Sequence, residues 1–228
     1  PDIEREVAGP EPTLVVWRTQ ARGPVPDTEL ALCDALVNCR SRHPVTAPLI
    51  ARLERCKIVS QAGVGFNHID LEACAARGIP VCNTPDYGTS EVADHALGLA
   101  LALSRGIVAY DRKLRTRAIG WDARVQPQVR RIKGLTFGVV GLGRIGLAAA
   151  LRARAFELAV DFYDPYLPPG FERALGFRRA ASLAELLGRV DIVSLHTPLT
   201  ALTERMVDDA ALAAARPGLV LVNTSRGR

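Results

Sequence analysis

The chain has 228 residues, of which 48% are hydrophobic and 23% are charged, and it carries a net charge of +5. This composition is typical of a globular protein with a sizeable core, and the length allows one or two domains. The longest apolar stretch, residues 92–103, is interrupted by Asp94 and His95 and is shorter than the roughly 20 residues of a membrane span, so no membrane contact is expected. The basic residues are scattered with few aromatics among them, so direct contact with nucleic acid is not expected either.

The first 85 residues alternate short apolar runs with helical patterns. Strands are expected at residues 13–18, 35–39, 57–61 and 79–82, and helices at residues 2–7, 27–32, 46–55 and 71–77. Elements of these lengths in strict alternation predict a parallel sheet that is covered on both faces.

After Pro85 the rhythm changes, and it then resumes as a second alternating region. Helices are predicted at residues 91–104, 107–116, 145–156, 183–187 and 208–215, an irregular segment at residues 118–131, and strands at residues 135–140, 158–163, 191–195 and 219–222 with a short candidate at 177–179. We therefore expect a first domain of residues 1–85 and a second of residues 86–228. The second region has four or five predicted strands, whereas a dinucleotide-binding sheet has about six. The chain also begins in a helical pattern without Met. We therefore expect truncation at both ends.

A glycine-rich turn joins the strand at residues 135–140 to the helix that follows it. Gly141 allows the sharp reversal, Gly143 lets the backbone approach a pyrophosphate, and Gly146 lets helix and strand pack closely. The next strand ends at Asp164, eighteen positions beyond Gly146. A carboxylate there can accept hydrogen bonds from both hydroxyls of an adenosine ribose and would repel a 2′-phosphate. The alternative is a glycine turn with an unrelated surface aspartate, which the combined spacing disfavours.

Two further segments follow predicted strands and carry polar groups. Gly63 and Gly65 expose backbone N–H groups after the third strand, where the sequence predicts the opening of a helix, and such a nest suits a carboxylate. Arg226 follows the last strand, and its planar, permanently charged group can grip a carboxylate and polarise an adjacent carbonyl. Because ligands bind at the carboxyl ends of parallel strands, we expect Val64, Gly65 and Arg226 to hold an anion beside a dinucleotide. A surface arginine in a turn is the alternative for Arg226.

These motifs resemble those of the D-isomer-specific 2-hydroxyacid dehydrogenases, and the likeness extends over nearly the whole chain. The segments that carry it are Gly63-Val-Gly-Phe-Asn-His-Ile-Asp70, Asn83-Thr-Pro-Asp-Tyr-Gly-Thr-Ser-Glu-Val-Ala-Asp94, Val139-Val-Gly-Leu-Gly-Arg-Ile-Gly146, Phe162-Tyr-Asp-Pro-Tyr-Leu167 and Val222-Asn-Thr-Ser-Arg-Gly227. Within the family, the runs at residues 163–167 and 172–176 resemble the subgroup similar to C-terminal-binding proteins. The resemblance implies an α/β protein with two doubly wound parallel-sheet domains, a flavodoxin-like substrate domain and a Rossmann NAD-binding domain that is incomplete at its C-terminal end.

The resemblance also implies roles for individual residues. Val64 and Gly65 match the loop whose backbone meets the substrate carboxylate, and Arg226 matches the catalytic arginine that orients the substrate. NAD is expected to contact Thr89, Gly141, Gly143, Arg144, Ile145, Gly146, Asp164, Thr197, Pro198, Thr203, Thr224 and Ser225. No metal site is expected, because no pair of the four histidines has the spacing of zinc ligands.

The implied reaction passes a hydride between nicotinamide and C2 of a 2-hydroxy or 2-keto acid, while a histidine paired with a glutamate exchanges the proton. In the family both of those residues follow the arginine motif, beyond the last residue of this chain. For His196, which ends a predicted strand, a structural or nucleotide-contact role is favoured over that of a general acid. The alternative function is an NAD(H)-sensing dimeric scaffold similar to the corepressors of the named subgroup, whose first domain docks partner peptides.

The resemblance further implies a homodimer formed through the helix after the hinge, here residues 91–104. The five cysteines, at positions 33, 39, 56, 74 and 82, contain no Cys-x-x-Cys pair, and several lie in apolar runs. An odd number without a pairing motif favours a reducing compartment, and we expect a cytoplasmic protein.

Overall fold

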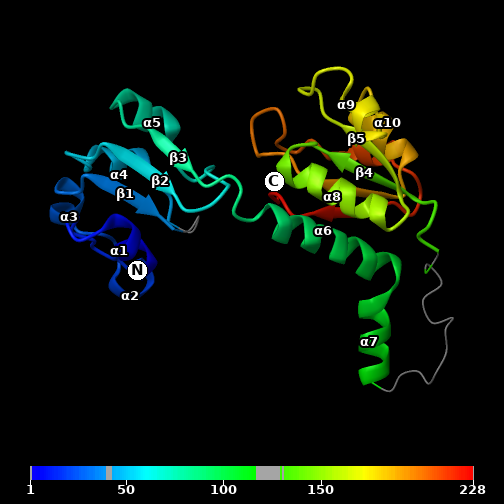
Figure 1. Ribbon diagram of the computed structural model, residues 1–228, viewed down its shortest axis with the longest axis horizontal. Helices are drawn as coiled ribbons and strands as arrows, with labels where there is room; N and C mark the ends of the chain where they lie inside the picture. The colour runs from blue at the N-terminus through cyan, green and yellow to red at the C-terminus, as the bar shows by residue number, and fades with distance from the viewer. Residues whose placement is uncertain (1, 40–42, 117–128, 130, 228) are drawn as a thin grey trace. The chain divides into compact units, whose positions relative to one another are not determined.

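The structure of the protein is a computed structural model that describes residues 2–39, 43–116, 129 and 131–227 (Figure 1). Its internal contacts divide the chain into two compact units, Pro1–Tyr87 and Gly88–Arg228, which are called unit 1 and unit 2 below. The division falls close to the hinge that the sequence predicts at Pro85. Most of the segment predicted to be irregular, residues 118–131, lies outside the described residues.

Unit 1 contains a three-stranded parallel sheet whose strands lie in chain order. The strands are β1 (Ala35–Asn38), β2 (Ile58–Gln61) and β3 (Val81–Asn83), and the helices are α1 (Asp2–Ala8), α2 (Thr19–Arg22), α3 (Asp27–Ala31), α4 (Ala47–Ala51) and α5 (Leu71–Ala76). One apolar cluster joins sheet and helices, with Ile50, Leu53 and Val59 almost fully buried. Three of the four strands predicted here are confirmed, whereas the flavodoxin-like subtype stays a prediction.

The prediction of a strand at residues 13–18 is wrong. The structure gives this segment no strand, and α2 follows it directly. Val15 is 58% exposed, and among the described residues the segment forms no ladder with β1 or any other strand. An apolar run becomes a strand only when a neighbouring strand pairs its N–H and C=O groups, and sequence periodicity does not report that partner.

Unit 2 contains a five-stranded parallel sheet in the order β6-β5-β4-β7-β8. The strands are β4 (Thr136–Val140), β5 (Ala159–Tyr163), β6 (Arg178–Arg179), β7 (Ile192–Leu195) and β8 (Val220–Asn223). From β4 the chain runs outward through β5 to β6, and it then returns to the other side of β4 for β7 and β8. The predicted doubly wound arrangement is thus confirmed, and all five strand predictions in this region agree with the structure to within one or two residues.

Two apolar cores on opposite faces hold this sheet. The helices of unit 2 are α6 (Thr89–Ser104), α7 (Ile107–Arg115), α8 (Arg144–Ala155), α9 (Phe171–Leu175), α10 (Leu183–Arg189) and α11 (Asp209–Ala213). Phe137 and Val139 pack with residues of α6 and α8, whereas Val140 packs with residues of α10 and α11. Because side chains alternate along a strand, β4 is buried on both sides, which explains its unbroken apolar sequence.

The remaining helices follow from local signals. The helices predicted at residues 91–104 and 107–116 are confirmed as α6 and α7, and Gly106, with a left-handed φ of 66°, separates them at a bend. The sequence does not predict α9, which has five residues between Gly170 and Gly176 and is too short to show a helical period. Across the described residues no single helix is long and apolar enough to cross a membrane, and α6 with α7 reaches that length and composition only as a pair bent by 62°.

Candidate functional site

The glycine-rich turn of unit 2 lies where the sheet reverses its direction of winding. Gly141 follows β4 and donates its N–H to the Tyr163 carbonyl of β5 at 2.9 Å, while His196 after β7 donates to the Val140 carbonyl at 2.8 Å. Gly141 has a φ of +86°, and a Cβ there would lie 3.1 Å from the His196 carbonyl oxygen. Both the left-handed conformation and the close neighbour require glycine at this position. The turn therefore opens at the switch point, where doubly wound sheets bind their ligands.

The other two glycines of the turn have different surroundings. A Cβ on Gly146 would lie 2.0 Å from the Gly141 carbonyl oxygen, so no side chain fits between helix α8 and the turn. Gly143 precedes the first residue of α8, and a Cβ there would meet no heavy atom within 4 Å. The first turn of α8 contains no acidic residue and no side chain caps it. Its N–H groups and the positive end of the helix are thus available to a phosphate beside Gly143.

Asp164 follows β5 and faces the same turn. One carboxylate oxygen accepts the Leu142 N–H at 2.9 Å and the other accepts the Tyr166 N–H at 2.9 Å. Each oxygen has further capacity to accept hydrogen bonds, so the pair of ribose hydroxyls expected from the sequence can be accommodated. The structure therefore couples the acid to the glycine turn directly, which the sequence spacing alone does not reveal.

Arg179 on β6 holds the segment that carries Asp164. Its guanidinium lies over the Phe162 ring, 5.1 Å from the centroid, and donates to the carbonyls of Leu167 at 3.0 Å and Pro168 at 2.8 Å. Its Nε also lies 3.2 Å from a carboxylate oxygen of Glu172 in α9. These contacts hold the loop after β5 against the edge strand β6. Because they involve residues both before and after Asp164, they stabilise the position of this residue.

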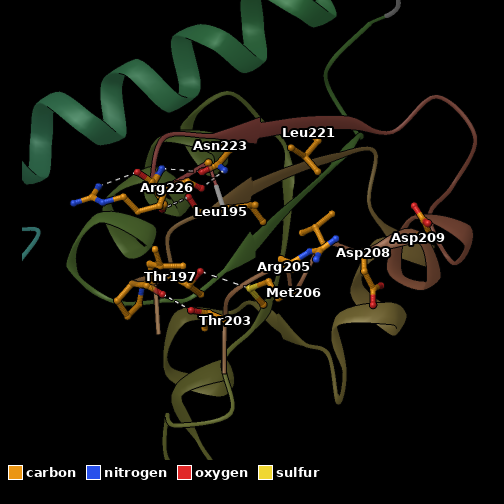
Figure 2. A pocket seen from close by; sticks show the side chains of 15 residues that line it. Leu195, Thr197, Thr203, Arg205, Met206, Asp208, Asp209, Leu221, Asn223 and Arg226 are labelled. Atoms are coloured by element: carbon orange, nitrogen blue, oxygen red, sulfur yellow. Dashed lines mark hydrogen bonds between the residues drawn. The ribbon is translucent and has the colours of Figure 1, made fainter. Parts of the chain in front are cut away.

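A cavity of about 370 Å³ lies between the segments that follow β7 and β8 (Figure 2). Five residues predicted from the sequence line it, namely Thr197, Pro198, Thr203, Ser225 and Arg226. Leu199 and Asn223, which belong to the segments expected at this edge of the sheet, line it as well. The sequence did not predict a site role for the other lining residues, namely Leu195, Arg205, Met206, Val207, Asp208, Asp209, Leu221 and Gly227. Figure 2 shows Asn223 and Arg226 at one end of this hollow and Arg205 with Asp208 at the other.

A network of short hydrogen bonds shapes the turn after β8. The Asn223 side chain accepts the Ser225 N–H at 2.9 Å and donates to the Arg226 carbonyl at 2.7 Å. The Ser225 hydroxyl donates to the Leu195 carbonyl of β7 at 2.9 Å, and the Arg226 guanidinium donates to the Ser225 carbonyl at 2.9 Å. Asn223 thus folds the turn so that the exposed Arg226 side chain leaves it beside the cavity, a role that the sequence alone does not indicate.

The segment after β7 is fixed by its threonines. The Thr203 hydroxyl accepts the Thr200 N–H at 2.9 Å and donates to the Pro198 carbonyl at 2.5 Å. The Thr197 hydroxyl donates to the Met206 sulfur at 3.6 Å. Arg205 adopts an uncommon left-handed φ of 54°, a feature that sequence patterns do not report for a residue other than glycine. Asp208 is visible in the sequence only as the start of a helix, and it does cap α11 by accepting the Ala211 N–H at 2.8 Å.

His196 is packed at the base of this segment. Its Nε2 lies 2.9 Å from the Ser194 hydroxyl, and burial lowers the pKa of His196 from 6.5 to about 4. The imidazole is therefore neutral at pH 7 and has no proton to donate as a general acid. This agrees with the structural role favoured from the sequence.

Besides the glycine turn, the start of α8 and Asp164, two more predicted cofactor residues of unit 2 do not line the cavity. Thr89 is the first residue of α6, and Thr224 follows β8 with its hydroxyl buried and without a hydrogen-bond partner among the described residues. The assignments of Thr89 and Thr224 to the cofactor stay predictions. Within the described part of the chain no group of three or more His, Cys, Asp or Glu side chains could hold a metal ion.

In unit 1 the loop after β2 carries Val64 and Gly65. The Val64 carbonyl accepts the Asn83 side chain at 2.8 Å, and the Gly63 carbonyl accepts the Thr84 N–H at 3.1 Å, so the segment after β3 anchors the loop. No hydrogen bond among the described residues uses the N–H groups of Val64 and Gly65. These two donors suit a carboxylate.

The expectation that a helix N-terminus assists this loop is not met. Helix α5 begins at Leu71, several residues beyond Gly65, and has only six residues. The Asp70 side chain accepts the Ala73 N–H at 2.9 Å and so caps the helix itself. A capped N-terminus has its positive end satisfied by its own carboxylate, and the loop therefore offers only its backbone N–H groups to an anion.

Comparison with known proteins extends these observations. The sequence pattern of the D-isomer specific 2-hydroxyacid dehydrogenase NAD-binding domain matches residues 97–228. A D-3-phosphoglycerate dehydrogenase of Mycobacterium bovis is 43% identical over 208 residues, which are 90% of this chain and 38% of the relative. A glyoxylate reductase of Korarchaeum cryptofilum is 38% identical over 230 residues, which are 100% of this chain and 65% of the relative. The chain thus spans less than half the length of the phosphoglycerate dehydrogenase that it matches.

A solved structure shows the same arrangement. The D-lactate dehydrogenase of Aquifex aeolicus, solved with NAD and lactic acid, superposes with a TM-score of 0.81 at 30% sequence identity over 89% of this chain and 60% of that chain. The α/β fold with parallel sheets and a Rossmann-like unit is therefore shared with a protein that binds NAD.

Proposed function

The chain belongs to the D-isomer specific 2-hydroxyacid dehydrogenase family, and on that premise we propose that its protein transfers a hydride between NAD(H) and C2 of a D-2-hydroxy acid or the corresponding 2-keto acid. The matched domain of the family is an NAD-binding domain. The observation that carries the proposal is the direct bond between the glycine turn and Asp164 at the switch point of unit 2. Arg226 follows β8 of the same parallel sheet.

Different residues of unit 2 would bind different parts of the coenzyme. The N–H groups at the start of α8, at Arg144 and Ile145, would bind the pyrophosphate, and the Asp164 carboxylate would accept the ribose hydroxyls. The segment from Thr197 to Thr203 and the turn at residues 224–225 would line the remainder of the coenzyme, with Thr89 at the nicotinamide end. When bound, NAD supplies the hydride carrier, and the chain orients it.

The substrate contacts proposed for this chain are three. Arg226 would hold the substrate carboxylate and polarise the reacting carbonyl, because a guanidinium forms paired hydrogen bonds with oxygen acceptors. The N–H groups of Val64 and Gly65 in unit 1 would bind a substrate carboxylate. The names of the relatives suggest the candidates 3-phosphohydroxypyruvate, glyoxylate and pyruvate, which are the keto forms of their substrates or the substrates themselves.

The test is steady-state oxidation of NADH by the full-length protein with a panel of 2-keto acids that includes these three. Turnover with at least one keto acid and its loss in the Arg226→Ala variant are expected. An Arg226→Lys variant is the matched control, since it keeps the charge but loses the planar fork, and partial activity is expected from it. Absence of turnover with every keto acid would refute the enzymatic proposal.

A second candidate function is an NAD(H)-sensing scaffold of the kind found in the subgroup similar to C-terminal-binding proteins. The run at residues 163–167 supports that subgroup, and its Asp164 is bonded to the coenzyme turn, so coenzyme binding can order this segment. A scaffold would associate more strongly when NADH is added and would show no turnover. Sedimentation of the full-length protein with and without NADH, in parallel with the activity assay, separates the two functions.

We also propose that the protein is a cytoplasmic homodimer. One face of α6, with Ala96, Leu97 and Ala100, is buried within unit 2, but Leu103 of α6 and Val108 of α7 are 57% and 68% exposed near the bend. Exposed apolar side chains grouped along adjoining helices support an interface between two copies.

A further inference from the structure

Two cysteines of unit 1 occupy equivalent positions before neighbouring strands. Ala35 of β1 pairs with Ile58 of β2, and the Lys57 N–H donates to the Asp34 carbonyl at 2.9 Å, so the parallel ladder continues ahead of both strands. Counting back two residues from Ala35 and Ile58 places Cys33 opposite Cys56. Neighbouring strands lie about 5 Å apart, which is within the range of Cα separations that a disulfide bridges.

The two thiols also point the same way. The Cys33 Sγ donates to the Ala35 carbonyl at 3.0 Å, and the Cys56 Sγ donates to the Ile58 carbonyl at 3.2 Å. Each sulfur therefore reaches the carbonyl two residues ahead in its own segment. Cys33 packs against the apolar cluster that contains Cys56, and a hydrogen bond between the two side chains is among the causes that raise the pKa of Cys33.

Accessibility distinguishes Cys33 from the other buried thiols. Cys33 is partly exposed, Cys56 is 8% exposed, and Cys74 of α5, which belongs to the same cluster, is 1% exposed. Burial raises the pKa of the Cys33 thiol, and the neighbouring Cys56 raises it further. Cys33 therefore stays protonated at neutral pH and is not a fast nucleophile, but it is the member of the pair that an oxidant in solution can reach.

From this arrangement we propose that Cys33 and Cys56 form a site of reversible oxidative modification, closing to an intramolecular disulfide under hydrogen peroxide. The peroxide oxidises the Cys33 thiol to a sulfenic acid and releases one water. The Cys56 sulfur then attacks the Cys33 sulfur, the S–O bond breaks, and the hydroxyl leaves with the Cys56 proton as a second water. Each sulfur loses one electron, and the two electrons reduce one peroxide. The inference concerns unit 1 alone and does not depend on the proposed function.

The test treats the full-length, reduced, native protein with hydrogen peroxide, blocks the remaining thiols with N-ethylmaleimide, and digests it with trypsin and Asp-N together. Cleavage before Asp27 and Asp34 and after Arg55 and Lys57 separates Cys33 in peptide 27–33 from Cys39 in peptide 34–40 and Cys56 in peptide 56–57. Mass spectrometry should find peptide 27–33 linked to peptide 56–57, with a mass two hydrogen atoms below the sum of the two, and dithiothreitol should release them.

The variants Cys33→Ser and Cys56→Ser should each abolish the linked peptide, whereas Cys39→Ser, which removes an exposed cysteine nearby in the sequence, should leave its yield unchanged. Urea-unfolded protein should give mixed linkages, because the register that aligns the pair is lost. Linkage of Cys56 to Cys74 or Cys39 in the native protein, or an equal yield of the Cys33–Cys56 link after unfolding, would overturn the proposal. Recovery of Cys33 only as the blocked thiol while other cysteines are oxidised would do the same.

Discussion

Asp164 has two tasks that share one carboxylate. It accepts the N–H groups of Leu142 and Tyr166, which fixes the glycine turn and the start of the next loop, and in the proposed function it also accepts the ribose hydroxyls. A substitution there changes both the shape of the turn and the charge that a 2′-phosphate would meet. A changed turn would weaken the binding of NADH and NADPH equally, whereas loss of the charge would weaken NADH binding more than NADPH binding.

In the Asp164→Ala variant we expect NADH to bind at least about 10- to 100-fold more weakly, because a single hydrogen bond to a charged group contributes about 1.5–3 kcal/mol. NADPH should lose less or should gain, since the repelling charge is gone. Fluorescence titration of both coenzymes measures the change. Asp164→Asn is the control, because it removes the charge while an amide oxygen still accepts one N–H. An equal loss for NADH and NADPH would mean that the residue only shapes the turn.

The unfolding free energy of the protein should depend on pH through the partly buried side chain of His196. Its folded-state pKa of about 4 lies below the value of 6.5 for an unperturbed histidine, so the unfolded chain binds the proton more tightly. The stabilisation is fully present above pH 6.5 and is lost as the pH falls toward 4. Between pH 7 and pH 5 the protein should lose about 2 kcal/mol of unfolding free energy through this residue. Urea unfolding at the two pH values, compared with the His196→Gln variant, should show a smaller loss in the variant, and equal losses would disprove the assignment.

At the scale of the element, two glycines of the turn between β4 and α8 have different tasks: one allows helix packing and the other leaves space for the coenzyme. Gly146 has no room for a Cβ because the Gly141 carbonyl lies 2.0 Å from its position, whereas Gly143 has no heavy atom within 4 Å of its Cβ position. The same chemical change, one methyl group, therefore meets opposite surroundings three residues apart. Glycines of one motif can thus be required for different reasons, and each reason has its own measurement.

We expect Gly146→Ala to destabilise unit 2 by about 3 kcal/mol, because the methyl group overpacks the contact between the turn and the helix. Gly143→Ala should change the unfolding free energy by less than about 1 kcal/mol but weaken NADH binding about tenfold or more, because the methyl group occupies the space left for a phosphate. Thermal or urea unfolding and NADH titration, applied to both variants, test the pair. A stable Gly146→Ala protein, or normal NADH binding by Gly143→Ala, would contradict the corresponding half of the prediction.

At the scale of the whole molecule, the two units are each built around their own sheet and core, and the exposed apolar residues near the bend between α6 and α7 belong to unit 2. Helix α6 contributes to the core with one face and leaves Leu103 exposed on another. A face of this kind is typical of an interface, and the proposed homodimer would cover it.

Replacing Leu103 and Val108 together by lysine should weaken self-association of the full-length protein at least tenfold, because charged groups would have to lose water at an apolar interface. Analytical ultracentrifugation over a range of concentrations measures the change. Leu202→Lys is the matched control, since Leu202 is 79% exposed in unit 2 but lies in the segment after β7. Equal effects of the two replacements, or no effect of the double variant, would place the interface elsewhere.

Features that depend on residues close together in the chain could be predicted from the sequence. The strand β4, the sharp turn at Gly141, the close packing at Gly146 and the place of Asp164 at the end of β5 were predicted correctly, because strand periodicity and turn geometry act over a few residues. The strand predicted at residues 13–18 was wrong because a strand also needs a partner along the chain, and apolar periodicity carries no information about that partner.

Contacts between residues far apart in the chain could not be predicted and are seen only in the folded protein. Pairing of β7 with β8 brings the turn at Asn223 to the segment of Thr197 and places Arg205 and Met206 around one cavity. Pairing of β1 with β2 aligns Cys33 with Cys56, although the spacing of the cysteines in the sequence resembles no disulfide or metal motif. In both cases the contact depends on the register between strands, which is set by long-range hydrogen bonding and core packing rather than by the local order of residues.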